Sequence, residues 1–229
     1  MSAAAGISGT PACPIAAGCI VVHADNSLLV LDKPTGLLAV PGRGEDKQDC
    51  LSRRVQTLYP DALIVHRLDM ATSGLMLMAR SPEMQRALGK LFEQRNVYKR
   101  YIAVVDGRLV NPDPLNDWQR IDLPIAADWP RRPLRVVDAG GKPSQTRWRV
   151  LAFDAQTATT RVELEPITGR SHQLRVHLQA LGHPIVGDAL YAPEAVQHKA
   201  RRLLLHASAL RFMHPVSGES AQFTTSPPF

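Results

Sequence analysis

Short apolar runs separated by turn-forming residues dominate the first part of the chain. Residues 18–23 and 27–32 are two such runs, and residues 24–26 between them have the composition of a turn. This pattern predicts a β-hairpin. Residues 33–44, which follow, are rich in proline and glycine and therefore predict a loop.

Helical spacing of apolar residues predicts three helices, over 51–58, 82–92 and 174–181. The first helix is expected to end before Pro60 and the third before Gly182. Ser81 has the residue type of an N-cap, and Pro82 suits the first position of a helix. The second helix therefore has the clearest predicted start.

Strand patterns are more numerous than helical ones. Apolar or alternating runs predict strands at 75–79, 99–106, 145–151, 161–165 and 203–212. Because most of these strands are neighbours in sequence, we expect an α+β fold with a mixed, mostly antiparallel central sheet and a few flanking helices. The proline-rich stretch 107–133 is expected to be a long connection and the seam of the fold. Residues 1–17 are expected to be a flexible tail, and 18–229 a single domain.

Composition narrows the class of protein. Lys and Arg number 27 against 21 Asp and Glu, and the resulting net charge of +6 suits a polyanionic partner or reflects only the arginine usage of a GC-rich genome. Three cysteines without C-x-x-C spacing favour neither a disulfide framework nor a zinc knuckle, and fit a reducing cytoplasm. No segment has the roughly 18 uninterrupted apolar residues of a membrane span, and residues 1–18 contain no Lys or Arg as a signal peptide would.

Residues 66–74, His-Arg-Leu-Asp-Met-Ala-Thr-Ser-Gly, place Asp69 near Arg67 at a turn between apolar segments. An ionised carboxylate close to C1′ of a sugar can attack that carbon or stabilise oxocarbenium charge, so Asp69 is a candidate nucleophile or general base. The alternative is an acid that only caps local backbone amides. Tyr101, in an expected strand, is by itself an ordinary strand tyrosine.

A second polar stretch, 166–177, puts Arg170 just before the third predicted helix. An anionic partner, such as a carboxylate or phosphate, is favourable there; otherwise Arg170 is a plain surface arginine. His172 and His177 are five residues apart and point in different directions on a helix or a strand, so they cannot chelate a metal together. Motifs typical of zinc proteases, P-loops, dinucleotide binding and serine esterases are absent from the sequence.

Taken together, these motifs resemble the RluA family of pseudouridine synthases. The resemblance rests on residues 66–75, the strand containing Tyr101 and residues 169–177, and it extends over 32–37, 182–188 and 203–207. It implies the pseudouridine synthase fold with a central active-site cleft, and makes 18–229 the catalytic domain. The S4-like RNA-binding module found in many members has no room before residue 18.

The resemblance implies that the chain isomerises specific uridines in structured RNA to pseudouridine, in 23S rRNA, in tRNA anticodon stem-loops or in both. It implies no cofactor or metal, no membrane and no obligatory protein partner. Asp69 would then be the essential carboxylate, Arg170 its ion-pair partner, and Tyr101 a stacking partner for the uracil. RNA contact or base flipping is expected for Arg43, His66, Arg67, Thr72, Arg131, Arg132 and Arg175.

Two other classes of protein use part of the same residue set. A uridine N-glycosidase would share the carboxylate but release free uracil. A catalytically silent RNA-binding protein would keep the arginines and would not need Asp69.

Overall fold

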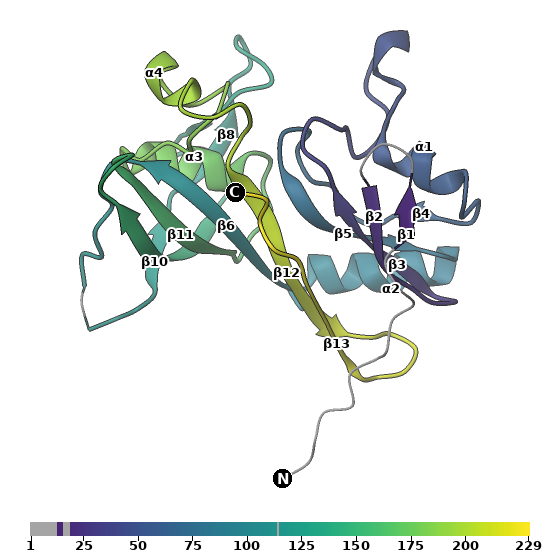
Figure 1. The fold of residues 1–229 in the computed structure, drawn as a ribbon. Coiled ribbons are helices and arrows are strands. Elements are labelled where there is room, and N and C mark those ends of the chain that lie inside the picture. The colour runs from purple at the N-terminus through teal and green to yellow at the C-terminus, as the bar shows by residue number, and fades with distance from the viewer. Residues whose placement is uncertain (1–12, 16–18, 114) are drawn as a thin grey trace. The chain divides into compact units, whose positions relative to one another are not determined.

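A computed structural model describes residues 13–15, 19–113 and 115–229. The chain divides into two compact units, each built from two segments (Figure 1). The first unit comprises the residues up to Tyr98 together with Ala209–Thr225, and the second comprises Lys99–Ser208 and Ser226–Phe229. Strands outnumber helices in the described part of both units. The expected α+β fold with a mostly antiparallel sheet is confirmed.

The sheet of the first unit has the order β1-β2-β3-β5-β12, with β4 on β5 and β13 on β12. Its strands are β1 (Cys13–Ile15), β2 (Cys19–Ala24), β3 (Leu28–Lys33), β4 (Leu63–Ile64), β5 (Ser73–Ala79), the end of β12 (Leu205–Met213) and β13 (Ser220–Thr224). The pairs β1/β2, β2/β3, β3/β5, β4/β5 and β12/β13 are antiparallel.

The predicted hairpin near the start of the chain is confirmed as β2 and β3. Its turn is fixed by Asp25, whose Oδ1 accepts the backbone N–H groups of Ser27 at 2.6 Å and Leu28 at 2.8 Å. Within the expected tail the structure describes only Cys13–Ile15, and these residues form β1, so this part is a strand rather than a tail. The other residues of the expected tail lie outside the described part of the chain.

The helices of the first unit are α1 (Leu51–Gln56) and α2 (Pro82–Glu93), with a 3-10 turn at Glu45–Lys47. Ser81 caps α2 as predicted, because its Oγ accepts the N–H of Met84 at 3.1 Å. One face of α2 packs into a buried cluster with strands β3 and β5. The late segment of the chain completes this cluster with Leu210, Phe212 and Ala221.

The second unit contains a four-stranded antiparallel sheet with the order β6-β11-β10-β7 (Figure 1). Its strands are β6 (Tyr98–Asp106), β7 (Gln119–Asp122), β10 (Gln145–Asp154) and β11 (Thr159–Pro166); the unit also contains the hairpin strands β8 (Ile125–Ala127) and β9 (Arg135–Val137), and the helices α3 (Gln173–Ala180) and α4 (Glu194–Gln197). No helix in the described residues is long and apolar enough to cross a membrane.

Two expectations about the middle of the chain are wrong. The stretch 107–133 is not one long connection, because it contains β7 and β8. Both strands are only three or four residues long, too short for alternation to be visible, and Pro124 lies between them. The seam also lies elsewhere, since the boundary between the units falls between Tyr98 and Lys99, and again between Ser208 and Ala209.

The alternation predicted for β10 and β11 is confirmed, and its buried face holds a histidine of α3. His177 is fully buried, its Nδ1 accepts from the Thr146 hydroxyl at 2.9 Å, and its Nε2–H donates to the Leu123 carbonyl at 3.0 Å. Burial lowers the pKa of His177, because the charged ring would lose its hydration. The neutral ring is therefore the form that this core accepts.

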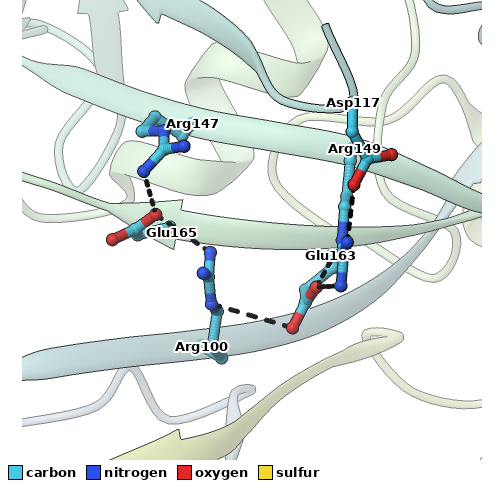
Figure 2. A network of polar contacts seen from close by, with 6 residues as sticks. All are labelled: Arg100, Asp117, Arg147, Arg149, Glu163 and Glu165. Carbon is cyan, nitrogen blue, oxygen red and sulfur yellow. Dashed lines mark hydrogen bonds and ion pairs between the residues drawn. The ribbon is translucent and has the colours of Figure 1, made fainter.

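The opposite face of the same sheet carries a chain of ion pairs across β10, β11 and β6 (Figure 2). Glu165 accepts from Arg147 at 3.0 Å and from Arg100 at 2.9 Å, and Glu163 binds Arg149 at 2.7 Å. Three arginines also lie over the ring of Trp118, with Arg100 nearest at 4.0 Å from the ring centre. With Asp117 bound to Arg149, three arginines face three carboxylates, so these formal charges cancel.

Candidate active site

Asp69 lies in the first unit on a turn between β4 and β5. The Thr72 N–H donates to the Asp69 carbonyl at 3.1 Å, which closes a four-residue turn with Met70 and Ala71 at its centre. Asp69 is half-buried, whereas the Met70 side chain is 52% exposed. The turn thus presents an acidic and an apolar side chain next to each other.

The side chain of Lys33 supports this turn through hydrogen bonds to backbone carbonyls. Its side chain is fully buried, and its Nζ donates to three carbonyls: Pro34 at 2.8 Å, Leu37 at 2.7 Å and Met70 at 3.1 Å. The Gly36 N–H also donates to the Met70 carbonyl, at 2.9 Å. Three hydrogen bonds satisfy the three donors of an ammonium group. The loop predicted after β3 therefore forms a cradle, consisting of residues 33–37, for the turn that carries Asp69.

Thr35 adds a third contact between cradle and turn, because its hydroxyl donates to the Ala71 carbonyl at 2.7 Å. Gly36 makes the cradle possible through its φ of +80°, a backbone conformation that side chains with a Cβ rarely adopt. Two adjacent carbonyls of the turn are thus fixed by side chains from a segment more than 30 residues earlier. The backbone of the Asp69 turn is held rigidly.

The other expected site residues of the first unit differ in their surroundings. Arg67 and Arg43 are exposed, whereas Thr72 is buried. His66 is tied to the fold: its Nε2 accepts the Leu77 N–H at 2.9 Å, and its ring stacks on Phe92 with centres 4.4 Å apart. These contacts favour a structural part for His66, since an acceptor Nε2 fixes the ring and its tautomer.

Tyr101 and Arg170 belong to the second unit. Tyr101 lies on β6 opposite Leu164 of β11 and is half-buried. Arg170 is exposed and lies three residues before α3, close to the expected place. Its backbone N–H donates to Oε1 of Gln173 at 3.0 Å, while the Gln173 amide nitrogen donates to the Gln145 carbonyl at 2.9 Å. The loop that carries Arg170 is therefore anchored to β10.

Arg175 is buried in α3 and forms a bidentate ion pair with Asp188. Its Nε lies 2.8 Å and its Nη2 2.6 Å from the two carboxylate oxygens, and the side chains are 4% and 1% exposed. Such geometry is typical of a fixed, structural guanidinium. It favours a positioning part for Arg175 over contact with a phosphate in solution.

Residues 125–137, the hairpin formed by β8 and β9, are called the arm here. Arg131 and Arg132 are exposed near its tip; Arg131 pairs with Asp128 at 2.6 Å, and Arg132 lies over the ring of Trp129 at 4.4 Å. Trp129 is itself 67% exposed. An exposed indole covered by a guanidinium offers two flat surfaces on which a nucleobase can stack.

The ion pairs separate the arginines into two groups. Arg43, Arg67 and Arg132 form no ion pair among the described residues of their own units, in contrast to Arg100, Arg147, Arg149 and Arg175. Guanidinium groups without an internal carboxylate are available to a phosphate, and so is the exposed Arg131, because a surface ion pair such as that with Asp128 contributes little. No cluster of three or more His, Cys, Asp or Glu in the described residues could hold a metal ion.

Comparison with known proteins identifies the family of this chain. Residues 27–180 match the family described as RNA pseudouridylate synthase. The chain belongs to this family. It is 47% identical over 205 residues to the dual-specificity RNA pseudouridine synthase RluA of Escherichia coli O6:H1, covering 89% of this chain and 91% of that protein. For RluA of Vibrio parahaemolyticus the identity is 49% over 201 residues, covering 86% and 78%.

Solved structures agree with this assignment. Human RNA pseudouridylate synthase domain containing 1 superposes with a TM-score of 0.75 at 29% identity, covering 91% of this chain and 83% of that chain. The human domain containing 4 protein gives 0.70 at 26% identity, with 91% and 88% covered. The expected family, fold and enzyme class are confirmed: the chain is an RNA pseudouridine synthase, an isomerase that converts uridine to pseudouridine in RNA.

Three features of the site were not predicted. Lys33 and Trp129 lie in stretches that entered the resemblance to the family without either side chain being given a part in the site, and Met70 lies inside the Asp69 motif without a part of its own. A lysine between Asp32 and Pro34, at the end of a strand that begins with four apolar residues, was an available signal, because lysine is rarely buried unless it is paired.

Proposed function

We propose that this synthase acts on uridines in the loops of RNA stem-loops, in rRNA and tRNA, with Asp69 as the carboxylate that acts at C1′ of the ribose. The reaction breaks the N1–C1′ bond, turns the uracil and forms the C5–C1′ bond; the proton at C5 is released to solvent, and N1 takes up a proton in exchange. The product is an isomer of the substrate, so no water oxygen is added and the reaction requires no redox step. The relatives' description as dual-specificity enzymes supports two classes of RNA substrate.

The observation that carries this proposal is the fixed backbone of the Asp69 turn. A carboxylate that attacks or stabilises C1′ must be held within a fraction of an ångström of its working position. Lys33 and Thr35 fix the two carbonyls that follow Asp69, at 3.1 and 2.7 Å, and an acid that served only to cap local amides would not need this support. Met70, exposed beside Asp69, supplies an apolar surface for a flipped base.

We assign a cationic partner to the Asp69 carboxylate, and two arginines of the second unit were expected to take part in the site. Arg170, the partner expected from the sequence, is exposed, whereas Arg175 is buried and held by Asp188. We assign the pair to Arg170, because the Arg175 guanidinium already binds both carboxylate oxygens of Asp188. Arg170→Ala should lower turnover at saturating RNA, and unchanged turnover would refute the assignment.

Tyr101 and the arm contribute the remaining contacts to RNA. We assign stacking on the target uracil to Tyr101, flipping to Arg67, and contact with the RNA around the target to Trp129, Arg131 and Arg132. Side chains read loop bases more easily than duplex bases, because the major groove of A-form RNA is deep and narrow. An RNA stem-loop is small enough for the synthase to bind without an accessory protein. We assign the synthase to the cytoplasm.

The decisive experiment uses Asp69→Asn with a stem-loop transcript that carries tritium at C5 of uridine. Tritium release should fall by at least a thousandfold, while RNA affinity changes by less than threefold, because the amide cannot supply the negative charge. Turnover within tenfold of the wild type would refute the assignment. Analysis of wild-type product for retained base excludes or establishes N-glycosidase activity, and activity only on assembled ribosomal particles would refute the stem-loop substrate.

A further inference from the structure

One hydroxyl in the second unit joins two segments to which the proposed function assigns different tasks. The Tyr191 oxygen accepts the backbone N–H of Arg135 at 2.9 Å, and the same hydroxyl lies 2.6 Å from Nδ1 of His172. Arg135 is the first residue of β9 and therefore belongs to the arm, whereas His172 immediately precedes α3. Tyr191 is 6% exposed, so water does not replace these bonds easily.

The Tyr191 ring is held by apolar neighbours and by a guanidinium. It packs in a small core with Ile125 of the arm and Val176 of α3, and the partly buried Leu134 covers this core. The Arg175 guanidinium lies 4.9 Å from the ring centre. The ring alone therefore already holds the arm and α3 together through apolar contacts.

Asp188 fixes the backbone before the ring. Its Oδ1 accepts the N–H groups of Leu190 at 2.9 Å and Tyr191 at 3.2 Å, and both carboxylate oxygens bind Arg175. Asp188 is only 1% exposed. The hydroxyl of Tyr191 is thus delivered to one place by a rigid support, as a residue that positions others must be.

His172, which contacts the Tyr191 hydroxyl through its Nδ1, lies at the junction between the Arg170 loop and α3. His172 has a left-handed backbone with φ of +57°, which is unusual for a residue with a Cβ, and it lies two residues after Arg170. The Val176 N–H donates to the His172 carbonyl at 3.0 Å, and the Gln173 N–H donates to the Arg170 carbonyl at 3.1 Å. The position of the His172 ring therefore influences the conformation of the loop that carries Arg170.

We propose that Tyr191 is a positioning residue that couples the binding of RNA by the arm to the placement of the Arg170 loop. RNA held at Trp129 and Arg132 fixes the arm, the Arg135 N–H fixes the Tyr191 hydroxyl, and the hydroxyl fixes His172. Tyr191 itself touches neither the RNA nor the reacting uridine. This inference rests on the proposed function, specifically on the arm as a contact to RNA and on Arg170 as a site residue.

The test is a double-mutant cycle of Tyr191→Phe and Trp129→Ala on kcat/KM with a stem-loop transcript. Phenylalanine keeps the ring in its core and removes only the hydroxyl, so the variant should fold. Alone it should lower kcat at least tenfold with less than threefold change in KM; in the Trp129→Ala background it should cost less than threefold more, because the coupled contact is already lost. Tyr59→Phe, in the first unit, is the matched control and should leave both constants unchanged.

Hydrogen exchange gives a readout that does not depend on activity. The Arg135 amide should lose protection in Tyr191→Phe, and binding of RNA by the variant should no longer protect the amides of residues 172–176. Additive effects in the cycle, or a loss of thermal stability with unchanged kcat, would overturn the coupling and leave the proposed function intact. If Trp129→Ala leaves RNA affinity unchanged, the arm as an RNA contact fails, and this inference fails with it.

Discussion

Replacing Lys33 with methionine tests whether the cradle positions Asp69 or only stabilises the fold. Methionine keeps an unbranched side chain of similar length and removes the ammonium that binds the carbonyls of Pro34, Leu37 and Met70. The bond to Leu37 is buried, and a buried carbonyl left without a donor costs about 1–3 kcal/mol. The other two bonds are partly buried, so water recovers part of their loss.

The opposing effect is the desolvation of the ammonium. A buried charge costs several kcal/mol in lost hydration, and Lys33→Met removes this cost. The three carbonyls compensate the charge in the wild type, so we expect Lys33→Met to lower the free energy of unfolding by about 2–4 kcal/mol. This loss should not exceed the ~3–5 kcal/mol that is typical of breaking a buried ion pair. Unfolding in urea, monitored by circular dichroism, measures this difference.

The decisive measurement is turnover under conditions in which the variant is fully folded. Released from Lys33, the Met70 carbonyl keeps only its bond to the Gly36 N–H, and the Asp69 carboxylate should lose its fixed orientation. We expect single-turnover tritium release at saturating RNA to fall more than tenfold, with RNA affinity nearly unchanged. Lys90→Met on the exposed surface of α2 is the control and should leave stability and turnover as they are. A folded Lys33→Met protein with wild-type turnover would refute the positioning of Asp69 by the cradle.

Three further predictions concern other residues. Peroxide should inactivate the enzyme by oxidising Met70, so Met70→Leu should be protected and Met213→Leu should not, although the two methionines are 52% and 54% exposed; equal protection by both would refute contact of Met70 with the substrate. The pKa of His177 is lowered by burial, so the unfolded chain binds the proton at a higher pH than the folded chain does. The contribution of His177 to the free energy of unfolding should be fully present above about pH 6.5 and should decrease as the pH falls below that value. Urea midpoints between pH 5 and 8 should show this slope and lose it in His177→Gln. Arg67→Ala should lower turnover more than tenfold without changing the salt dependence of RNA binding, whereas Arg132→Ala should reduce its log-log slope by roughly 0.7–0.9; the reverse pattern would exchange their roles.

Long or strongly patterned elements could be predicted from the sequence. The β2–β3 hairpin, the Ser81 cap of α2 and the alternation in β10 and β11 follow from local residue types, which agree with the fold around them. β7 and β8 could not be predicted, because three or four residues carry too little periodicity, and β7 in addition pairs with β10, which is not the next strand along the chain. The boundary between the units was missed for a related reason, since it falls next to the first residue of a regular strand.

The candidate site was predictable where the motif itself carries chemistry. Asp69 and Arg170 became candidates from residue type and from their places at a turn and before a helix, places that the structure confirms, while their roles came from the resemblance to the family and stay predictions. The supporting residues were not found, because their parts depend on contacts across the chain: Lys33 reaches Met70 over 37 positions, and Tyr191 reaches Arg135 over 56. Burial also distinguishes Arg175 from Arg67, a difference that identical residue types conceal.

The division of each unit into two chain segments has a consequence for synthesis on the ribosome. The cluster around α2 and β5 receives Leu210, Phe212 and Ala221 only from the end of the chain, and all seven residues of β5 are buried in the finished fold. Roughly a hundred residues separate the two segments of the first unit, which at about 5–20 residues per second delays its completion by on the order of ten seconds. During this interval β5 has emerged without β12, its neighbour in the sheet, and so offers an unprotected apolar edge to chaperones or to other nascent chains. Although it emerges first, the first unit is completed only after almost all of the second has been synthesised.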